Sequence, residues 1–204
     1  MLPCLSNLIP IEEDMKATFA LLADLDVSNF VRKLAWDIHR KYCTGTSICR
    51  LLPHVSLKQL FEIEDLARLE AYMHEFAQTI QPFPIKCTEL QLVPTILEGM
   101  ETGILWLDVE ESVYLRRLHD RLNRELAQRL ANTQAPFDGS EYHFHMTVMM
   151  GGQPIEVYRT VYAEIAERTV DLGFTVNTLA MFVYDEPLCL NGNYMTYKIL
   201  PIGG

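Results

Sequence analysis

Residues 53–57 read Pro-His-Val-Ser-Leu, and residues 144–148 read Phe-His-Met-Thr-Val. Each stretch contains a histidine, then one apolar residue, then a hydroxyl residue, and His145 follows His54 by 91 residues. Side chains alternate between the two faces of a β-strand. If each stretch is a strand, its histidine and its hydroxyl share one face, while the apolar neighbours point the other way. The pattern therefore predicts two similar strands, each presenting an imidazole beside a hydroxyl.

The segments around the two motifs follow one another in the same order. Apolar spacing predicts a first series of strand, helix, extended segment, helix and strand at 17–24, 27–43, 49–62, 64–80 and 85–93. A second series in this order is predicted at 104–109, 112–131, 141–150, 154–168 and 172–185, before a last strand at 194–199. We therefore predict an α+β chain of two β-α-β-α-β units, with pseudo-repeats at about 17–93 and 104–186.

Composition and charge narrow the class of protein. The 204 residues are 49% hydrophobic and 22% charged, which is typical of a globular chain with a sizeable core and excludes a disordered one. No stretch approaches the ~20 apolar residues of a membrane span. The formal charge of −10 repels nucleic-acid backbones at long range, so duplex binding is disfavoured. A small anionic substrate or the end of an RNA remains compatible with a local site.

The cysteines indicate a reducing compartment. There are five of them, an odd number, and no Cys-x-x-Cys pair occurs. The N-terminal residues also lack the basic segment of a secretory signal. We therefore expect reduced thiols and a cytoplasmic location. The residues concerned are Cys4, Cys43, Cys49, Cys87 and Cys189.

The two motifs supply groups that phosphodiester chemistry uses. Imidazole has a pKa of about 6.5, so near neutrality one histidine can accept a proton while another donates one. A hydroxyl can donate a hydrogen bond to a phosphate oxygen without adding a charge. We therefore predict His54 and His145 as the catalytic pair, and Ser56 and Thr147 as phosphate-binding residues. The sequence leaves open which histidine is the base.

Through the motifs at 53–57 and 144–148 and the order of elements over about 17–200, the chain resembles the two-histidine (2H) phosphoesterase superfamily. This group comprises 2′-5′ RNA ligase-like proteins and cyclic nucleotide phosphodiesterases. The resemblance implies that residues 1–204 form a single bilobal domain, in which antiparallel-rich sheets line a central cleft. It also implies catalysis without a metal or another cofactor. Ser56 stands where the family pattern more commonly has threonine.

The resemblance further implies a phosphodiesterase that hydrolyses a 2′,3′-cyclic phosphate or a 2′-5′ linkage, with ligation as the reverse reaction. The substrate would be a small nucleotide or an RNA terminus. The alternative is a protein of the same fold that binds a nucleotide or an RNA end without turnover. Two complete His-x-hydroxyl pairs favour catalysis, because a binding protein has less need of two imidazoles.

Two further residues are candidates for the site. Lys58 lies two residues beyond Ser56 and can add a positive charge near a phosphate, but we favour a surface position for it. His143 would share a strand face with His145, and we favour a substrate contact at the cleft rim.

A metal-dependent hydrolase is a third interpretation, because two histidines at this spacing on a strand can bind a transition metal. Asp37 or His39 would then be distant ligands, although no cluster with clear ligand spacing occurs elsewhere. We favour the metal-free interpretation. His39, His74 and His119 are expected on helix surfaces, because their neighbours are polar.

Overall fold

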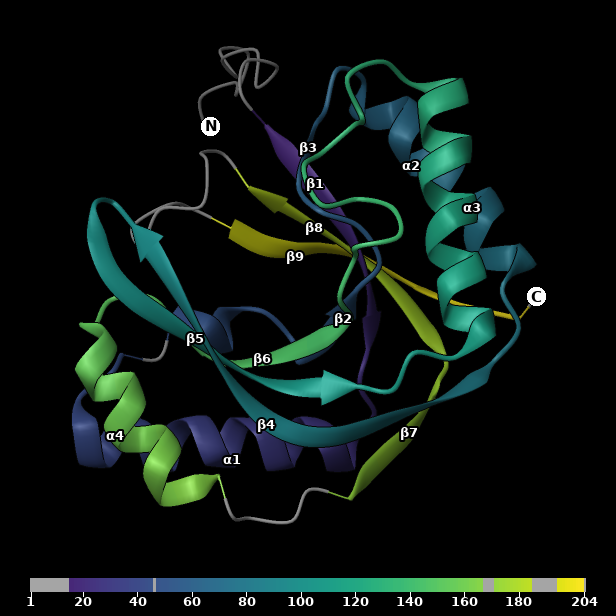
Figure 1. Cartoon of the computed structure of the whole chain (residues 1–204). Helices are drawn as coiled ribbons and strands as arrows, with labels where there is room; N and C mark the ends of the chain where they lie inside the picture. The colour runs from purple at the N-terminus through teal and green to yellow at the C-terminus, as the bar shows by residue number, and fades with distance from the viewer. Residues whose placement is uncertain (1–14, 46, 167–170, 185–193, 204) are drawn as a thin grey trace, which may run out of the picture.

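The structure of the protein, a computed structural model, describes residues 15–45, 47–166, 171–184 and 194–203 (Figure 1). The helices are α1 (Leu25–Tyr42), α2 (Leu66–Thr79), α3 (Val113–Arg129) and α4 (Ile155–Ile165), with a 3₁₀ helix η1 (Ser47–Arg50). The strands are β1 (Lys16–Leu22), β2 (His54–Ser56), β3 (Phe61–Glu62), β4 (Phe83–Leu97), β5 (Met100–Val109), β6 (His145–Met150), β7 (Leu172–Val176), β8 (Thr178–Tyr184) and β9 (Tyr194–Pro201).

The strands form two antiparallel sheets, which confirms the predicted α+β class. Sheet I has the order β2-β1-β8-β9, and β3 pairs with the opposite end of β1. Sheet II has the order β6-β5-β4-β7. Each sheet contains strands from both halves of the chain. The late strands β8 and β9 join β1 in sheet I, whereas the early strand β4 joins β5, β6 and β7 in sheet II.

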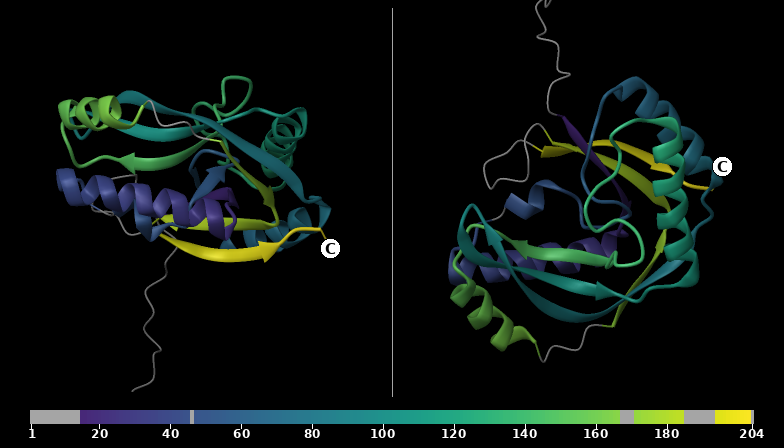
Figure 2. Two further views of the ribbon diagram at one scale, coloured as in Figure 1. Left: turned by 90° about the horizontal axis from the view of Figure 1, so that it is seen from below. Right: turned by 45° about the horizontal axis from the view of Figure 1, so that its top comes forward.

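The helices are exchanged between the sheets in the same way. Although α1 directly follows β1 of sheet I, it lies against β6, β7 and α4 (Figure 1). In the same figure α3 lies beside α2, which contacts β9 of sheet I, and Arg129 of α3 pairs with Glu75 of α2. Figure 2 shows these two helix pairs on opposite sides of the molecule. Each sheet is therefore covered by one helix from each half of the chain.

The local sequence explains the most buried elements. In α1, apolar residues recur every three or four positions and form one buried face. Its N terminus is capped by Asp24, whose side chain accepts a hydrogen bond from the Val27 amide at 2.9 Å. Strand β1 lies between β2 and β8, and six consecutive residues of it are buried, so neither of its faces is exposed to solvent. Because β2 pairs with β1, the position of β1 fixes where the first motif lies in sheet I.

Several elements depart from the predicted boundaries. The extended segment predicted at 49–62 is divided into the end of η1, β2 and β3, and β2 is only three residues long. The single strand predicted at 172–185 is two strands, β7 and β8, which belong to different sheets; residue 185 lies outside the described part. The strand predicted at 141–150 begins only at His145.

The β4–β5 hairpin extends well beyond the strands predicted at 85–93 and 104–109. The two strands meet in a two-residue turn at Glu98 and Gly99, with φ of 51° and 79°. Positive φ at both positions is the geometry of the tight hairpin turns that match the twist of the strands. The longer hairpin brings Leu97, the last residue of β4, and the turn residue Glu98 to the cleft described below.

Three of the predicted thiols fall within the described residues, and all three are free: Cys43, Cys49 and Cys87. Cys4 and Cys189 lie outside them. In the part of the chain that the structure describes, no helix combines the length and the apolar character needed to cross a membrane.

Candidate active site

A cleft with a volume of about 510 Å³ lies between the two sheets. Sheet I lines it with residues of β1, β2, β8 and β9, and sheet II with residues of β4, β5 and β6. Both motifs therefore reach one site, although they come from different sheets. The predicted residues that line the cleft are His54, Ser56, Lys58, His143, His145 and Thr147.

Strand β2 presents the first motif to this cleft. His54 and Ser56 are partly exposed there, whereas Val55 and Leu57 are fully buried. This is the alternation expected of a strand. The His54 ring packs edge-on against Phe182 of β8, with the ring centroids 4.5 Å apart.

Strand β6 presents the second motif in the same manner. His145 and Thr147 are partly exposed, while Met146 and Val148 are fully buried. The neighbouring strand β5 contributes Trp106, which pairs with Thr147 in the strand register. The Trp106 ring stacks on the His145 ring with centroids 4.1 Å apart. The aromatic neighbour therefore lies face-on to His145, in contrast to the edge contact at His54.

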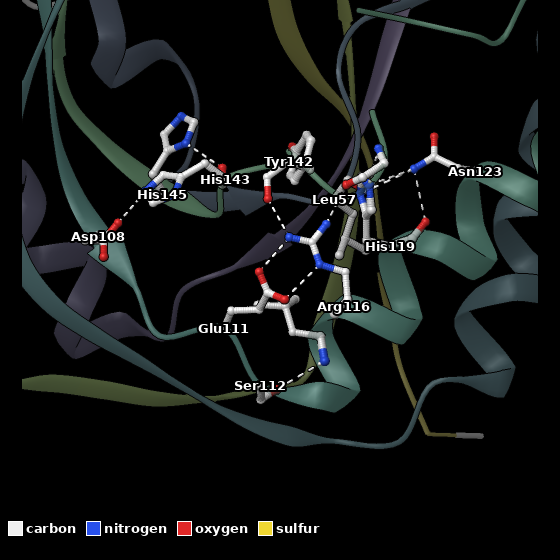
Figure 3. Close-up of polar contacts among 12 residues, drawn as sticks. Leu57, Asp108, Glu111, Ser112, Arg116, His119, Asn123, Tyr142, His143 and His145 are labelled. Carbon is white, nitrogen blue, oxygen red and sulfur yellow. Dashed lines mark hydrogen bonds and ion pairs between the residues drawn. The ribbon is translucent and has the colours of Figure 1, made fainter. Parts of the chain in front are cut away.

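Equivalent hydrogen bonds orient the two imidazoles. Nδ1 of His54 lies 2.7 Å from the Leu52 carbonyl oxygen. Nδ1 of His145 lies 3.0 Å from the His143 carbonyl oxygen, as Figure 3 shows. In each motif the acceptor is thus two residues before the histidine. A carbonyl oxygen only accepts, so each Nδ1 donates and keeps its proton. The nitrogen that is left to exchange a proton is Nε2 in both rings.

Burial lowers the pKa of both imidazoles from 6.5. Desolvation is the main cause at His54; it outweighs the hydrogen bond to the Leu52 carbonyl and brings the pKa to about 4. Desolvation also lowers the pKa of His145, and the charge of the His143 ring adds to this change, whereas the hydrogen bond to the His143 carbonyl and the Asp108 carboxylate oppose it. The face of Trp106 further favours the cation. The positively charged form is therefore better supported at His145 than at His54.

Asp108 is a site residue that the two motifs do not indicate. Its carboxylate accepts a hydrogen bond from Nε2 of His143 (Figure 3). Asp108 pairs with His145 in the β5–β6 register, so the carboxylate and both histidines are brought together by strand pairing. His143 is half exposed, and it lies at the cleft rim where we expected it. Only the pairing of β5 with β6 reveals this contact.

Lys58 is not the surface lysine that we expected. Its side chain is 1% exposed, and its Nζ is paired with the Asp138 carboxylate and donates to Asn123 Oδ1 at 2.7 Å. The expectation failed because lysine is usually exposed, whereas here Asp138 and Asn123 supply partners for the buried Nζ. Desolvation lowers the pKa of Lys58, and the contacts with Asp138 oppose that change. The lysine lines the cleft, but its charge is already paired.

His119 is also wrongly predicted as a surface residue. It is fully buried on the face of α3 that carries Leu115 and Leu122. Its Nδ1 lies 2.7 Å from the Leu57 carbonyl oxygen (Figure 3). Its Nε2 accepts a hydrogen bond from the Gly139 amide at 3.1 Å. The spacing of four residues from Leu115 and three from Leu122 is the signal that would have placed it in the core. His74 is exposed, as expected.

The residues suggested as distant metal ligands are not in the cleft. Asp37 and His39 lie on α1, and His39 Nδ1 accepts a hydrogen bond from the Gly45 amide at 3.0 Å. The ring centroids of His143 and His145 are 6.4 Å apart, and each ring has a hydrogen-bonded nitrogen. Within the described ranges, no group of three or more His, Cys, Asp or Glu residues is arranged to hold a metal ion.

Comparison with known proteins gives consistent matches in sequence. The model of the family described as the 2′-5′ RNA ligase superfamily matches residues 24–187. A protein of Geobacillus sp. (strain WCH70), named "Putative phosphoesterase", is 26% identical over 156 residues, which cover 74% of this chain and 79% of the relative. A protein of the same name from Geobacillus thermodenitrificans (strain NG80-2) is 27% identical over 157 residues, with the same coverage of 74% and 79%.

Solved structures show a similar fold at low sequence identity. The protein TT0787 of Thermus thermophilus matches with a TM-score of 0.57 and 16% identity, over 93% of this chain and 98% of that one. LigT of E. coli, in its complex with 3′-AMP, matches with a TM-score of 0.51 and 14% identity, over 94% of this chain and 100% of that one. The fold of two antiparallel sheets with flanking helices is therefore shared with these solved structures.

Proposed function

The chain belongs to the 2′-5′ RNA ligase superfamily, a group of two-histidine phosphoesterases, and from that membership we propose that it opens 2′,3′-cyclic phosphates or cleaves 2′-5′ phosphodiester linkages in small nucleotides or at RNA ends. The observation that carries this proposal is that two His-x-hydroxyl motifs meet in one cleft. The 3′-AMP bound by the structurally similar LigT supports a nucleotide as the ligand.

In the proposed reaction the two imidazoles act as a base and an acid. Nε2 of one histidine takes a proton from water, and the water oxygen forms a new bond to phosphorus. The phosphorus–oxygen bond on the opposite side breaks, and the leaving ribose oxygen receives a proton from Nε2 of the other histidine. Ser56 and Thr147 donate hydrogen bonds to the non-bridging oxygens. In the ligation direction the two histidines exchange roles.

We assign the base to His54 and the acid to His145 in the hydrolytic direction. His54 has the pKa of about 4, so it is neutral over most of the accessible pH range. His145 stacks on Trp106 and lies near the Asp108 carboxylate, and both neighbours favour its protonated form. A bound phosphodiester anion would raise the pKa of both rings. His145, the proposed acid, would then stay charged until it donates its proton.

Turnover of defined substrates tests the proposal. The purified protein at micromolar concentration is mixed with 2′,3′-cyclic AMP or with 2′-5′-linked adenylyl-adenosine, and the products are separated by chromatography. We expect product from at least one of them, in buffer with EDTA as well as without it. Binding of these nucleotides without product would favour the binding-protein alternative. Activity lost in EDTA and restored by zinc or manganese would favour a metal site at His143 and His145.

Removal of either hydroxyl is expected to weaken catalysis moderately. Ser56→Ala and Thr147→Ala each remove one neutral donor to an anion, which predicts a roughly 5- to 100-fold loss in kcat/KM. Thr147→Ser keeps the hydroxyl and should retain most of the activity, whereas Thr147→Val keeps the shape and should not. Equal activity of the serine and valine variants would contradict a phosphate-binding role for Thr147.

The pH dependence of kcat/KM is expected to be bell-shaped, with its maximum on the acid side of neutrality. The reactive form has neutral His54 and charged His145. It forms as pH rises through about 4, the pKa of His54, and it is lost as pH rises through the pKa of His145, which lies below 6.5. The two apparent pKa values belong to the coupled pair. Asp108→Asn removes a carboxylate that raises the pKa of His145, so the basic limb should move to lower pH. A maximum above pH 7.5 would contradict the assignment.

A further inference from the structure

The loop between α3 and β6 carries the most exposed aromatic residue of the cleft. This residue is Phe137, which lines the cleft beside Tyr142 and whose side chain is 76% exposed. Tyr142, by comparison, is buried. An exposed phenylalanine leaves a large apolar surface in water, and here that surface lies at the mouth of the proposed active site.

The backbone of Phe137 is strained. Its φ is 67°, and the amide of Asp138 donates to the carbonyl oxygen of Ala135 at 3.4 Å. Proline at the second position and positive φ at the third are the features of a type II turn, whose third position is normally glycine. A bulky residue is a costly choice there, and its exposed ring gains no compensating burial. Strain of this kind is often kept at a binding or catalytic site.

Buried contacts hold the residues that follow Phe137. The Asp138 carboxylate pairs with Lys58 and accepts from the Gln59 amide at 3.2 Å. The Gly139 amide donates to His119, and the Gly139 carbonyl oxygen accepts from Arg116 Nη1 at 2.6 Å. Figure 3 shows Arg116 and His119 beside Tyr142, at the end of this loop. The loop is therefore fixed independently of the Phe137 ring, and the ring is left free to meet a ligand.

The other aromatic side chains of the cleft already have ring partners. Trp106 stacks on His145, and Tyr142 stacks on His119 with centroids 4.3 Å apart. Tyr184 and Tyr194 stack on each other at 5.7 Å. Phe137 has no ring partner within the part of the chain that the structure describes. Among these aromatic residues of the cleft, Phe137 is the one whose ring is not stacked on another ring.

We propose that Phe137 is a specificity-determining residue that stacks on the nucleobase of the substrate. This inference rests on the proposed function and deepens it, because it names the base as a recognised part of the ligand. Every base offers a π face to an aromatic ring, and a purine offers a larger one than a pyrimidine. Phe137 therefore favours purine nucleotides.

The charge of the cleft agrees with recognition through the base. Of the lining residues within the described ranges, Lys58 is the one lysine or arginine, and Asp138 pairs with it. Binding to a long RNA relies on basic residues along its phosphates. The substrate thus gains its affinity from one phosphodiester and one stacked base, as expected for a mononucleotide or a short nucleotide end.

The test compares a substrate that has a base with one that lacks it. The substrates are 2′,3′-cyclic AMP and methyl riboside 2′,3′-cyclic phosphate, and the proteins are the wild type, Phe137→Ala and Phe137→Trp. For the cyclic nucleotide, we expect Phe137→Ala to raise KM roughly 5- to 100-fold with little change in kcat. For the base-free substrate, we expect no change in KM. Phe137→Trp should keep the low KM, and 2′,3′-cyclic CMP should show a smaller effect of Phe137→Ala.

Two controls separate stacking from a structural role. Trp36→Ala removes a different exposed aromatic ring, on α1 outside the cleft, and should leave both KM values unchanged. Phe137→Gly suits the positive φ, so its urea midpoint should be no lower than that of the wild type, while KM for the cyclic nucleotide rises. An unchanged KM in Phe137→Ala, or an equal rise for both substrates, would overturn the inference.

Failure of the proposed function gives a different result. If the wild type turns over neither substrate, the dissociation constant of 3′-AMP is compared with that of ribose 3-phosphate by calorimetry. If Phe137→Ala binds 3′-AMP more weakly than the wild type but binds ribose 3-phosphate equally well, the stacking inference stands and only the proposed hydrolysis fails. Absence of 3′-AMP binding to the wild type would overturn the inference together with the proposed function.

Discussion

Replacing either of the two histidines proposed as acid and base is expected to lower kcat by roughly 10²- to 10⁴-fold, the contribution of a positioned acid or base. In the proposed reaction, His54→Ala removes the group that takes the proton from water, and His145→Ala removes the group that gives a proton to the leaving oxygen. The double variant should be little worse than either single one, because the two residues act as a unit. Steady-state turnover of a 2′,3′-cyclic nucleotide measures the effect.

A matched control for these variants is His74→Ala, since His74 is exposed on α2 and does not line the cleft. Circular dichroism and a urea titration must show that each variant is folded, because His54 packs against Phe182 and contributes to the packing of sheet I. A folded His54→Ala or His145→Ala with near-normal turnover would show that the shared motif does not carry the chemistry.

Asp138→Asn is expected to lower the free energy of unfolding by about 3–5 kcal/mol, the usual cost of leaving a buried charge without its partner. The substitution keeps the shape of the side chain and removes only the charge that faces Lys58, which is 1% exposed. Without Asp138, which raises its pKa, Lys58 loses its proton more readily. The loss of stability should therefore be smaller at pH 9 than at pH 7. Urea unfolding at the two pH values measures it.

The double variant Lys58→Met/Asp138→Asn should recover much of this loss, because no charge is then left buried. Glu75→Gln serves as the control, since it breaks the exposed pair with Arg129 and should cost under about 1 kcal/mol. If Asp138→Asn unfolds at the same urea concentration as Glu75→Gln, the buried pair does not hold the loop.

The parts of the site that the sequence predicted are those that depend on local geometry. His54 and Ser56, like His145 and Thr147, share a face because a strand alternates, whatever it pairs with. The helical spacing of α1 and α3 predicted most of their buried faces in the same way, although Phe30 of α1 is exposed and His119 of α3 is buried. Such patterns need only neighbours in the chain.

The features that were missed depend on contacts between distant segments. Lys58 is buried because Asp138, 80 residues later, supplies its counter-charge. Asp108 meets His143 because β5 pairs with β6, and Phe182 reaches His54 because β8 pairs with β1. The predicted strand at 172–185 is divided between two sheets, and its apolar residues alone do not indicate where it changes partner. A single sequence has no pattern that records pairings of this kind.

The exchange of strands and helices between the sheets has a consequence for how the molecule moves and unfolds. Because each sheet contains strands from both halves of the chain, neither half can unfold without removing strands from both sheets. The chain also crosses from one sheet to the other several times. A hinge motion that opened one sheet against the other would therefore have to bend several connections at once. The spacing of His54 and His145 is therefore preorganised before a substrate arrives. Access of a substrate then depends on side chains and loops at the mouth of the cleft, and we expect the described part of the chain to unfold as one cooperative unit.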